Sequence, residues 1–284
     1  MNARELRNKG WRSYADLRRV ITRTGSSTSA LESLGDPPRT DLAAWNETTE
    51  ARHDGYRAAH PIVEGRVAVV CVSMRPQLID DVVANVGRQD GVDTELVFVA
   101  NSPDFDHDVV DAAFEPLGAV IERPPPDTSL GVALNRAMAR TDARFVAKFD
   151  DDDIYGANYL ADALRAHAYA GAGVVGKHSY FARIAETGAT HIRFPGNEFR
   201  YSGTLAGGTF VIDRDRVGGQ QFDDISLGED RAFLSRCHRR GISTFSADRF
   251  NFVQMRTGSN TWAIDDAAYL KRSIEVDDSA VIDR

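Results

Sequence analysis

The stretch that decides the fold is Arg144-Phe-Val-Ala-Lys-Phe149, followed at once by Asp150-Asp-Asp-Asp153. An apolar run that leads directly into four carboxylates predicts a buried strand with an acidic cluster at its carboxyl end. Because neighbouring carboxylates repel one another, we expect a cation at this edge. Carboxylates are hard oxygen donors suited to Mg²⁺, Mn²⁺ or Ca²⁺, and an ion held there can bind a phosphorylated ligand.

Strand and helix patterns alternate upstream of the cluster. Short apolar, β-branched runs predict strands at residues 67–72, 95–100, 119–121 and 145–149. Helical spacing of apolar residues predicts helices at residues 76–89, 109–117 and 130–140. This order predicts an α/β fold, a mainly parallel, Rossmann-like sheet flanked by helices and joined by right-handed crossovers. Ligands of such sheets bind at the carboxyl ends of the strands, where the acidic cluster lies.

The second half of the chain is more irregular. Helices are predicted at residues 159–169 and 229–240, and strands at 173–176, 191–194, 209–212, 242–245 and 250–254. Beyond Trp262 the signals for regular structure are weak, so we expect a poorly ordered tail there.

Composition excludes several classes of protein. The 284 residues are 42% hydrophobic and 27% charged, as in ordinary globular proteins, and the net charge of −8 argues against nucleic acid as a partner. Cys71 and Cys237 lie in apolar patterns and read as buried structural thiols. We see neither a signal peptide nor an apolar run that could span a bilayer, which predicts a cytoplasmic protein.

The first 23 residues are basic and partly amphipathic. Tyr14, Leu17, Val20 and Ile21 fall on helical spacing among arginines and lysines. Such a helix can lie on anionic lipid as a peripheral membrane contact at the inner face, or it can dock on its own domain or on a second subunit of a homo-oligomer. A second helix is predicted from Asp41 to Ala59.

Two acidic motifs can carry chemistry. Asp150 and Asp152 have the Asp-x-Asp spacing, at which two carboxylates after a strand reach one region. Glu229 and Asp230 open a predicted helix, where acids also stabilise the helix dipole. Considered with the upstream cluster, this second pair fits a catalytic base that takes a proton from an incoming hydroxyl.

Three weaker motifs accompany the acids. Ser129-Leu-Gly131 and Asn135-Arg136 precede the cluster, and an arginine there can bind a diphosphate or simply be exposed on a helix. Gly207-Gly-Thr209 allows a ligand to approach the backbone closely. Trp262 can cover a sugar or base, or be a peripheral packing residue.

Taken in order, these motifs resemble the family-2-like glycosyltransferases of the GT-A fold, from about Val67 to Trp262. The matching elements are Cys71-Val-Ser-Met-Arg-Pro76, Asn101-Ser102, Ser129-Leu-Gly131 with Asn135-Arg136, Lys148-Phe-Asp-Asp-Asp-Asp153, Gly207-Gly-Thr209 and Gly228-Glu-Asp230. The cluster and the later Gly-Glu-Asp look most like enzymes of bacterial surface-polysaccharide assembly. The late Gln-x-x-Arg-Trp motif of the processive synthases is absent from the sequence.

The resemblance implies a metal-dependent, inverting transfer from a nucleotide sugar, most simply a UDP-sugar, to a hydroxyl of a glycan acceptor. It makes Asp150 and Asp152 the metal pair, with Asp152 the direct ligand of Mn²⁺ or Mg²⁺, and Asp230, next to Glu229, the general base. The residues that it assigns to the nucleotide and its phosphates are Ser73, Arg75, Asn101, Asn135, Arg136, Asp150 and Asp151. Asn101 stands where the family often has an acid that contacts the base.

The resemblance also divides the chain. Residues 1–62 form a basic helical extension and linker, and residues 63–284 form the GT-A domain. Within that domain we expect a nucleotide-binding half at 63–153, an acceptor-binding half at 154–265 and a tail at 266–284.

Three other interpretations remain open. A phosphatase of the haloacid dehalogenase type also has Asp-x-Asp after a strand, but after its first core strand, whereas several strands precede the motif here. A calcium-binding loop would begin at Asp151, but Tyr155 and Asp162 fit its later positions poorly. The third is a non-catalytic, sugar-binding relative, against which the presence of both Asp152 and Asp230 argues.

Overall fold

The computed structural model describes residues 42–257 and 265–277. The predicted basic helix at 1–23 and Trp262 lie outside the described residues. The helices are α4 (Leu42–Ala59), α5 (Ile79–Gly87), α6 (His107–Phe114), α7 (Leu130–Met138), α8 (Tyr159–Ala170), α9 (Arg214–Val217), α10 (Glu229–Arg239) and α11 (Asp266–Leu270), with 3₁₀ turns η1 (Pro76–Leu78), η2 (Glu115–Leu117) and η3 (Gly207–Thr209). The strands are β1 (Val67–Ser73), β2 (Thr94–Ala100), β3 (Val120–Glu122), β4 (Phe145–Phe149), β5 (Ile154–Tyr155), β6 (Val174–Gly176), β7 (Tyr180–Ile184), β8 (Thr190–Arg193), β9 (Arg200–Tyr201), β10 (Val211–Asp213), β11 (Thr244–Ser246), β12 (Phe252–Arg256) and β13 (Ser273–Val276).

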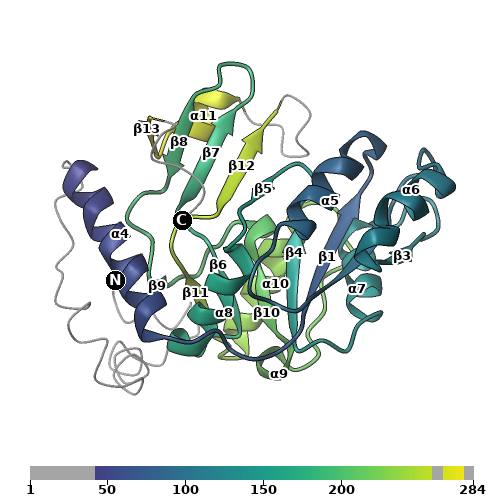
Figure 1. The fold of residues 1–284 in the computed structure, drawn as a ribbon, viewed down its shortest axis with the longest axis horizontal. Coiled ribbons are helices and arrows are strands. Elements are labelled where there is room, and N and C mark those ends of the chain that lie inside the picture. The colour runs from purple at the N-terminus through teal and green to yellow at the C-terminus, as the bar shows by residue number, and fades with distance from the viewer. Residues whose placement is uncertain (1–41, 258–264, 278–284) are drawn as a thin grey trace.

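A central sheet of eight strands organises the molecule, in the order β3-β2-β1-β4-β10-β6-β11-β9 (Figure 1). The strands β3, β2, β1 and β4 are parallel to one another, as the alternating sequence pattern predicts. The later strand β10 runs antiparallel between β4 and β6. The predicted α/β class with a mainly parallel first half is therefore confirmed.

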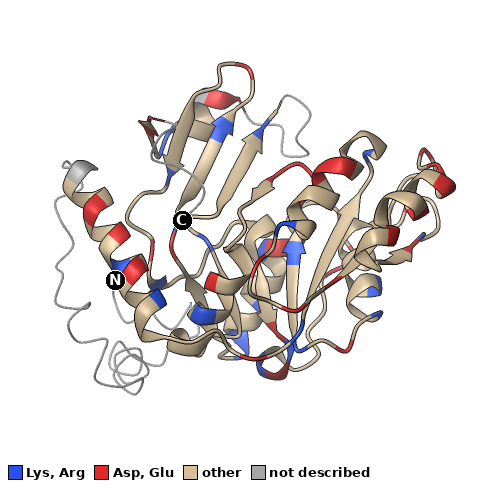
Figure 2. Ribbon diagram, viewed as in Figure 1, with Lys and Arg blue, Asp and Glu red and all other residues tan. Residues whose placement is uncertain are grey.

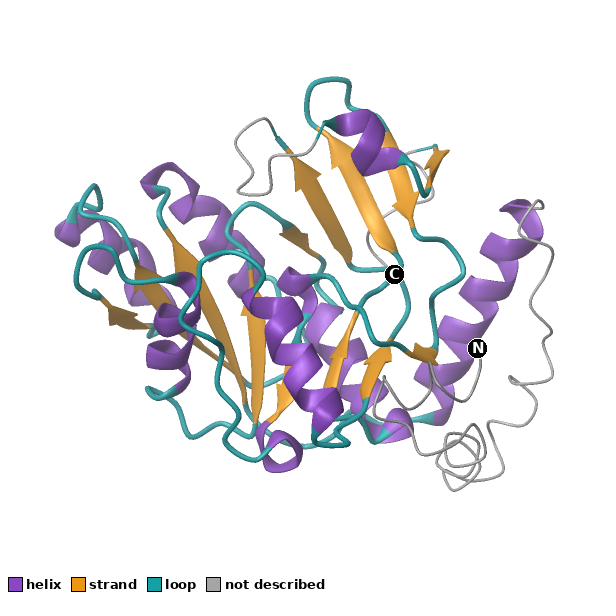
Figure 3. Ribbon diagram, turned by 180° about the vertical axis from the view of Figure 1, so that it is seen from behind, coloured by secondary structure: helices purple, strands orange, loops and turns teal. Residues whose placement is uncertain are grey.

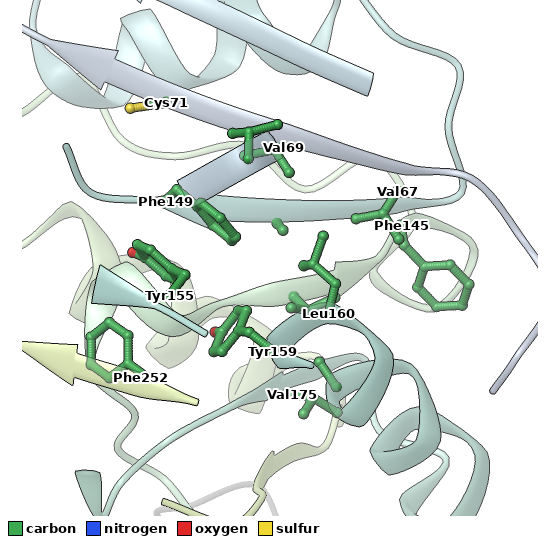
Figure 4. Packing of buried hydrophobic residues seen from close by; sticks show 14 of the residues in the cluster. Val67, Val69, Cys71, Phe145, Phe149, Tyr155, Tyr159, Leu160, Val175 and Phe252 are labelled. Carbon is green, nitrogen blue, oxygen red and sulfur yellow. The ribbon is translucent and has the colours of Figure 1, made fainter. Parts of the chain in front are cut away.

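Helices cover both faces of this sheet. Alternate residues of β1, among them Val67 and Val69, pack with α5, α6 and α8 on one face. The residues between them, Ala68 and Val70, pack with α7 and α10 on the other face. Figure 4 shows part of the first core, where Phe149 meets Tyr155 next to the labelled residues of β1 and α8. Burial on both faces explains why these strands read as continuous apolar runs.

A second sheet of five strands, β13-β8-β7-β12-β5, stands beside the first (Figure 3). The short strand β5 lies at its edge and connects it to β4 through the aspartate cluster. The expectation of weak order beyond Trp262 is wrong for residues 265–277, which form α11 and β13. Strand β13 pairs antiparallel with β8, with Ile274 opposite Ile192, so its order comes from a partner some eighty residues away that no local pattern reveals.

Helix α4 packs onto the domain rather than standing apart as a linker (Figure 1). The Tyr56 ring stacks on Tyr169 of α8 at 4.3 Å between centroids and on Phe199 at 5.2 Å. Arg57 forms two hydrogen bonds of 2.8 Å with the buried Asp162 carboxylate. Within residues 42–257 and 265–277, we find no helix with the length and apolar character needed to cross a membrane.

Candidate active site

Three parallel strands bring predicted site residues to one edge of the sheet. Ser73 ends β1 opposite Ala100 of β2, and the Asn101 amide donates to the Ser73 carbonyl at 2.8 Å. Strand β4 lies on the other side of β1, with Phe149 opposite Cys71, so the cluster follows at the same edge. The carboxyl ends of parallel strands thus bring together side chains that are distant in the sequence.

The four aspartates alternate between buried and accessible positions. The Asp151 carboxylate accepts hydrogen bonds from the Ser73 hydroxyl and the Arg75 guanidinium, and Asp153 accepts one from the Met255 amide at 3.0 Å. Both of these side chains are buried. Asp150 and Asp152 are 34% and 15% exposed, so the Asp-x-Asp pair is the one that faces outward. Figure 2 shows the acidic segment running into β5.

The buried side chain of Tyr155 holds the acidic turn in place. Its ring stacks on Phe149 at 3.7 Å, so the residues on either side of the four aspartates hold each other in place (Figure 4). Its hydroxyl accepts a hydrogen bond from the Asp150 amide at 2.8 Å and donates one to the Gly208 carbonyl at 2.6 Å. The turn is therefore held firmly in the fold, because the Tyr155 ring is stacked and its hydroxyl makes two hydrogen bonds.

Asp230 reaches the same edge from the first turn of α10. The Lys148 ammonium of β4 lies 2.8 Å from Asp150 Oδ1 and 3.5 Å from Asp230 Oδ1. One buried cation therefore joins the motif after β4 to the motif that opens α10. Burial lowers the pKa of Lys148, but the carboxylates of Asp150 and Asp230 outweigh burial and raise it, so the side chain is charged.

Gly207 and Gly208 leave the space that these two carboxylates occupy. A Cβ atom on Gly207 would lie 1.6 Å from Asp230 Oδ2, and one on Gly208 would lie 2.6 Å from Asp150 Oδ2. The sequence led us to expect a glycine pair that lets a ligand approach the backbone. In the structure the pair makes room for two acids of the protein, Asp230 and Asp150.

The environment makes several of these acids hold protons more tightly than usual. Burial and, after it, the neighbouring Asp230 carboxylate raise the pKa of Glu229 to about 7. Burial also raises the pKa of Asp230, which Lys148 partly offsets. The pKa of Asp152 is raised mainly by burial, against the lowering effect of Arg75. A cluster that resists full ionisation is suited to a cation, which favours the charged carboxylates.

Arg75 lies over the accessible side of the cluster. Its guanidinium donates to Asp152 Oδ2 at 2.8 Å and to Asp151 Oδ2 at 3.1 Å, and the Ser73 hydroxyl accepts a hydrogen bond from its backbone amide at 2.9 Å. The structure thus brings Ser73 and Arg75 together with the aspartates, and their role toward a nucleotide stays a prediction. Asn101 lies at the neighbouring strand end, with its side-chain amide donating to the Thr128 carbonyl at 3.1 Å.

The structure gives Asn135 and Arg136 other partners. The Asn135 amide bonds the Phe222 backbone twice, at 2.9 and 2.8 Å, and the Arg136 guanidinium lies 3.0 Å from Glu122 of β3. Gly131 packs against the carbonyl of Asp223, which its missing side chain would meet at 1.8 Å. Gly131 and Asn135 of α7 therefore hold the segment that leads into α10, whereas Arg136 pairs with β3.

Lys148 is the residue of this site to which the sequence analysis gave no role. A lysine in the middle of a strand that is otherwise apolar and buried is a signal that could have revealed it, because an isolated buried charge is costly. The pairing with Asp230 could not be found this way, since it depends on how α10 packs on the sheet.

A second group of titratable side chains lies under α4. His53, Asp162 and Asp248 are buried and offer ligand atoms within 4.8 Å of one another. Both carboxylates are already paired, however, and the cations that bind them are Arg57, Arg165 and Lys177. Because three cations face two carboxylates, a divalent ion would be repelled, and the cluster holds α4 against the domain.

Comparisons with known proteins show the family to which this fold belongs. The family model described as glycosyl transferase family 2 matches residues 67–221, more than half of the chain. The chain belongs to glycosyl transferase family 2. It is therefore a glycosyltransferase, and the matched segment ends before the Glu229–Asp230 pair. Among curated proteins, none matches this sequence significantly.

Solved structures show the same fold at low sequence identity. The mannosyltransferase PcManGT from Pyrobaculum calidifontis, in complex with GDP-Man and Mn²⁺, is 16% identical, with a TM-score of 0.55 over 87% of this chain and 70% of that one. TarS from S. aureus, as its 1–349 fragment with UDP-GlcNAc, is 15% identical, with a TM-score of 0.54 over 73% of this chain and 64% of that one. These likenesses confirm the GT-A fold. The chain spans less than two thirds of that TarS fragment.

Proposed function

We propose that this chain is a metal-dependent, inverting glycosyltransferase that moves a sugar from a nucleotide sugar to a hydroxyl of a glycan acceptor. The observation that carries the proposal is the Lys148 ammonium, 2.8 Å from Asp150 and 3.5 Å from Asp230. This ammonium lies between a carboxylate that can accept a proton and a carboxylate that can hold a metal ion, and such an ion can bind a diphosphate. A single displacement needs both kinds of group around one sugar.

The donor set fits a divalent cation. Within the described residues, four carboxylates, of Asp150, Asp151, Asp152 and Asp230, form ion pairs with two cations, Lys148 and Arg75. Asp153 and Glu229 lie close enough to add to the repulsion among these acids. Oxygen donors of this kind suit Mn²⁺ or Mg²⁺. We propose that Asp152, with Asp150 beside it, would hold the ion. Such an ion supplies positive charge that offsets the charge developing on a departing diphosphate.

Asp230 is proposed as the general base. In the transfer, the bond between the anomeric carbon and the diphosphate oxygen breaks, and the acceptor oxygen bonds that carbon from the opposite face. The bonding electrons leave with the nucleoside diphosphate, and the acceptor hydroxyl gives its proton to Asp230. A base in this role typically contributes roughly 10²- to 10⁴-fold. Glu229 lies next to Asp230, and burial and Asp230 raise its pKa to about 7. A hydrogen bond from Glu229 favours the charged form of Asp230.

The nucleotide is proposed to lie across the ends of β1 and β2. Ser73, Arg75 and Asn101 offer it hydroxyl, guanidinium and amide groups, and Asp150 and Asp151 lie at the adjoining strand end. Arg75 can exchange its single hydrogen bond to Asp152 for one to a phosphate oxygen while it keeps its bidentate contact with Asp151, since a guanidinium donates to carboxylate and phosphate oxygens alike. PcManGT binds GDP-Man and TarS binds UDP-GlcNAc, and we propose a UDP-sugar here. The proposed phosphate contacts of Asn135 and Arg136 require them to leave their present partners.

The wider setting is also a proposal. We infer a role in bacterial surface-polysaccharide assembly at the cytoplasmic face, with the basic residues 1–23 as a peripheral membrane contact or a contact in a homo-oligomer. The motif order that resembles such enzymes supports this role, as does the acidic net charge of −8, which disfavours nucleic acid.

A thermal-shift panel of nucleotides and nucleotide sugars, each with and without Mn²⁺ or Mg²⁺, tests the donor and the metal. A ligand at about 100 times its Kd stabilises the folded state by about 2.7 kcal/mol, which raises Tm by several degrees in a chain of this size. Asp152→Ala should lose the metal-dependent part of the shift. Asp142→Asn, at a carboxylate that is 90% exposed, is the matched control and should keep it.

Turnover tests the base. Asp230→Asn should keep the donor-induced thermal shift and lower kcat by about 10²- to 10⁴-fold. Near-normal turnover by Asp230→Asn would overturn the assignment of the base. Donor binding without any turnover by the wild-type protein would instead favour a non-catalytic, sugar-binding relative.

A further inference from the structure

Lys148 is a charged side chain in the most buried part of the sheet. It lies in β4 between Ala147 and Phe149, and it is 4% exposed. Its backbone amide donates to the Phe210 carbonyl at 2.8 Å, so strand pairing is fixed without the side chain. An apolar residue of similar length would fill this space at a lower desolvation cost. Packing alone therefore does not explain why this position carries an ammonium group.

The ammonium connects two carboxylates that come from different parts of the chain. Asp150 follows β4, and Asp230 lies eighty residues further on, in the first turn of α10. Among the described residues, Lys148 is the one cation in ion-pair contact with Asp230. Without it, the two partly exposed carboxylates would face each other with no cation between them and would repel each other.

The opposite side of both carboxylates is closed by bare backbone. Gly207 and Gly208 approach them so closely that a single added methyl group on either would overlap an oxygen. Asp230 is thus held between the ammonium on one side and the η3 turn on the other. The Asp230 side chain is nevertheless 26% exposed, so it has solvent into which it can turn when the cation is removed.

We propose that Lys148 is a positioning residue for the transfer reaction, holding the Asp230 carboxylate beside Asp150 at the edge where the donor binds. This inference rests on the proposed function, because it acts through Asp230 as the base. Lys148 itself touches neither the sugar nor the acceptor. The alternative is a simple counter-ion that neutralises Asp150 and has no influence on Asp230.

The experiment compares kcat, donor KM and donor Kd for the wild type, Lys148→Met, Lys148→Arg and Asp230→Asn, with UDP-sugar and Mn²⁺ present. Lys148→Met removes the charge and keeps the length. We expect it to lower kcat by about 10²-fold or more, as loss of a positioned base does, with donor Kd changed less than about threefold. Lys148→Arg, which keeps the charge, should have a kcat at least tenfold higher than that of Lys148→Met.

A double-variant comparison separates positioning from a general structural effect. If Lys148 acts through Asp230, adding Lys148→Met to Asp230→Asn should lower kcat by less than about threefold. If Lys148→Met unfolds at the assay temperature, Lys148→Met/Asp150→Asn replaces it, because the charge of Asp150 is then removed together with the cation that balances it, and the remaining Asp230 carboxylate is partly exposed. It is compared with Asp150→Asn alone, and a further fall in kcat of about 10²-fold is expected.

Two results overturn the inference while leaving the proposed function intact. One is a Lys148→Met enzyme with kcat within about threefold of wild type, when Asp230→Asn lowers kcat by about 10²-fold or more. The other is an equal fall in kcat when Lys148→Met is placed in the wild type and in Asp230→Asn. Normal turnover by Asp230→Asn would instead refute the proposed base, and absent turnover by the wild type would refute the proposed activity.

Discussion

Gly207→Ala should disable the enzyme although it changes neither a carboxylate nor a ligand-binding side chain. The new methyl group would lie 1.6 Å from Asp230 Oδ2 and 2.4 Å from its Cγ, against an ordinary contact of 3.4–4 Å. The carboxylate must therefore move by about 2 Å, because the two atoms cannot overlap. Since a misplacement of about 1 Å can cost about 10²-fold, we expect kcat to fall by about 10²- to 10⁴-fold.

The assay is steady-state turnover, followed by release of the nucleoside diphosphate, together with donor Kd and Tm. Donor Kd should change little, because the displaced group faces the acceptor in the proposed mechanism. Overpacking of this kind typically costs about 1–3 kcal/mol of folding free energy, so Tm should fall by a few degrees only. The matched control is Gly87→Ala at the end of α5, where the added methyl group meets Leu117 at 3.8 Å and fits.

One comparison can refute this reasoning. If Gly207→Ala acts by displacing Asp230, it should cost almost nothing when added to Asp230→Asn. A variant that keeps kcat within about threefold of wild type, while Asp230→Asn is inactive, would mean that Asp230 does not need its observed position.

Three further outcomes follow from burial and charge. Burial and the nearby Asp230 raise the pKa of Glu229 to about 7 from an ordinary 4.5, so ionisation of Glu229 destabilises the fold as pH rises through that window. In urea melts Glu229→Gln should therefore have a free energy of unfolding higher than the wild type by about 3 kcal/mol at pH 8 and equal to it at pH 4. Tyr155→Phe leaves the Asp150 amide and a carbonyl without partners and should lower the free energy of unfolding by about 1–3 kcal/mol in the same melts. Arg57→Met should lower the free energy of unfolding by about 2–3 kcal/mol, since Asp162 stays buried with one strong partner fewer. Arg57→Lys should restore part of that free energy.

The first half of the fold could be predicted from the sequence because its signals are local. Each strand from β1 to β4 is a short apolar run between helices, and a parallel order follows from that alternation. The convergence of Ser73, Asn101 and Asp150 at one edge also follows, since the carboxyl ends of parallel strands share an edge.

The rest depends on contacts between distant segments. Strand β7 and the edge strand β5 have no strong pattern of their own, and they are ordered by pairing with β12. The contact of Gly207 with Asp230 could not be predicted for the same reason, because Asp230 lies in another element. Likewise, the sequence does not reveal that the side-chain amide of Asn135 makes two hydrogen bonds with the Phe222 backbone, because Phe222 is far away in the sequence.

Charge balance, rather than the number of acids, separates the two buried acidic clusters of this protein. Under α4, the carboxylates of Asp162 and Asp248 are each held by strong cations, and Lys177 and His53 outweigh burial to lower the pKa of Asp248. At the sheet edge the opposite holds, because burial and neighbouring acids raise the pKa of Asp152 despite Arg75. Added Mn²⁺ should therefore raise Tm through the sheet edge alone, and Asp152→Ala, but not His53→Gln, should abolish that rise. A rise that survives Asp152→Ala and disappears in His53→Gln would reverse the assignment of the two clusters.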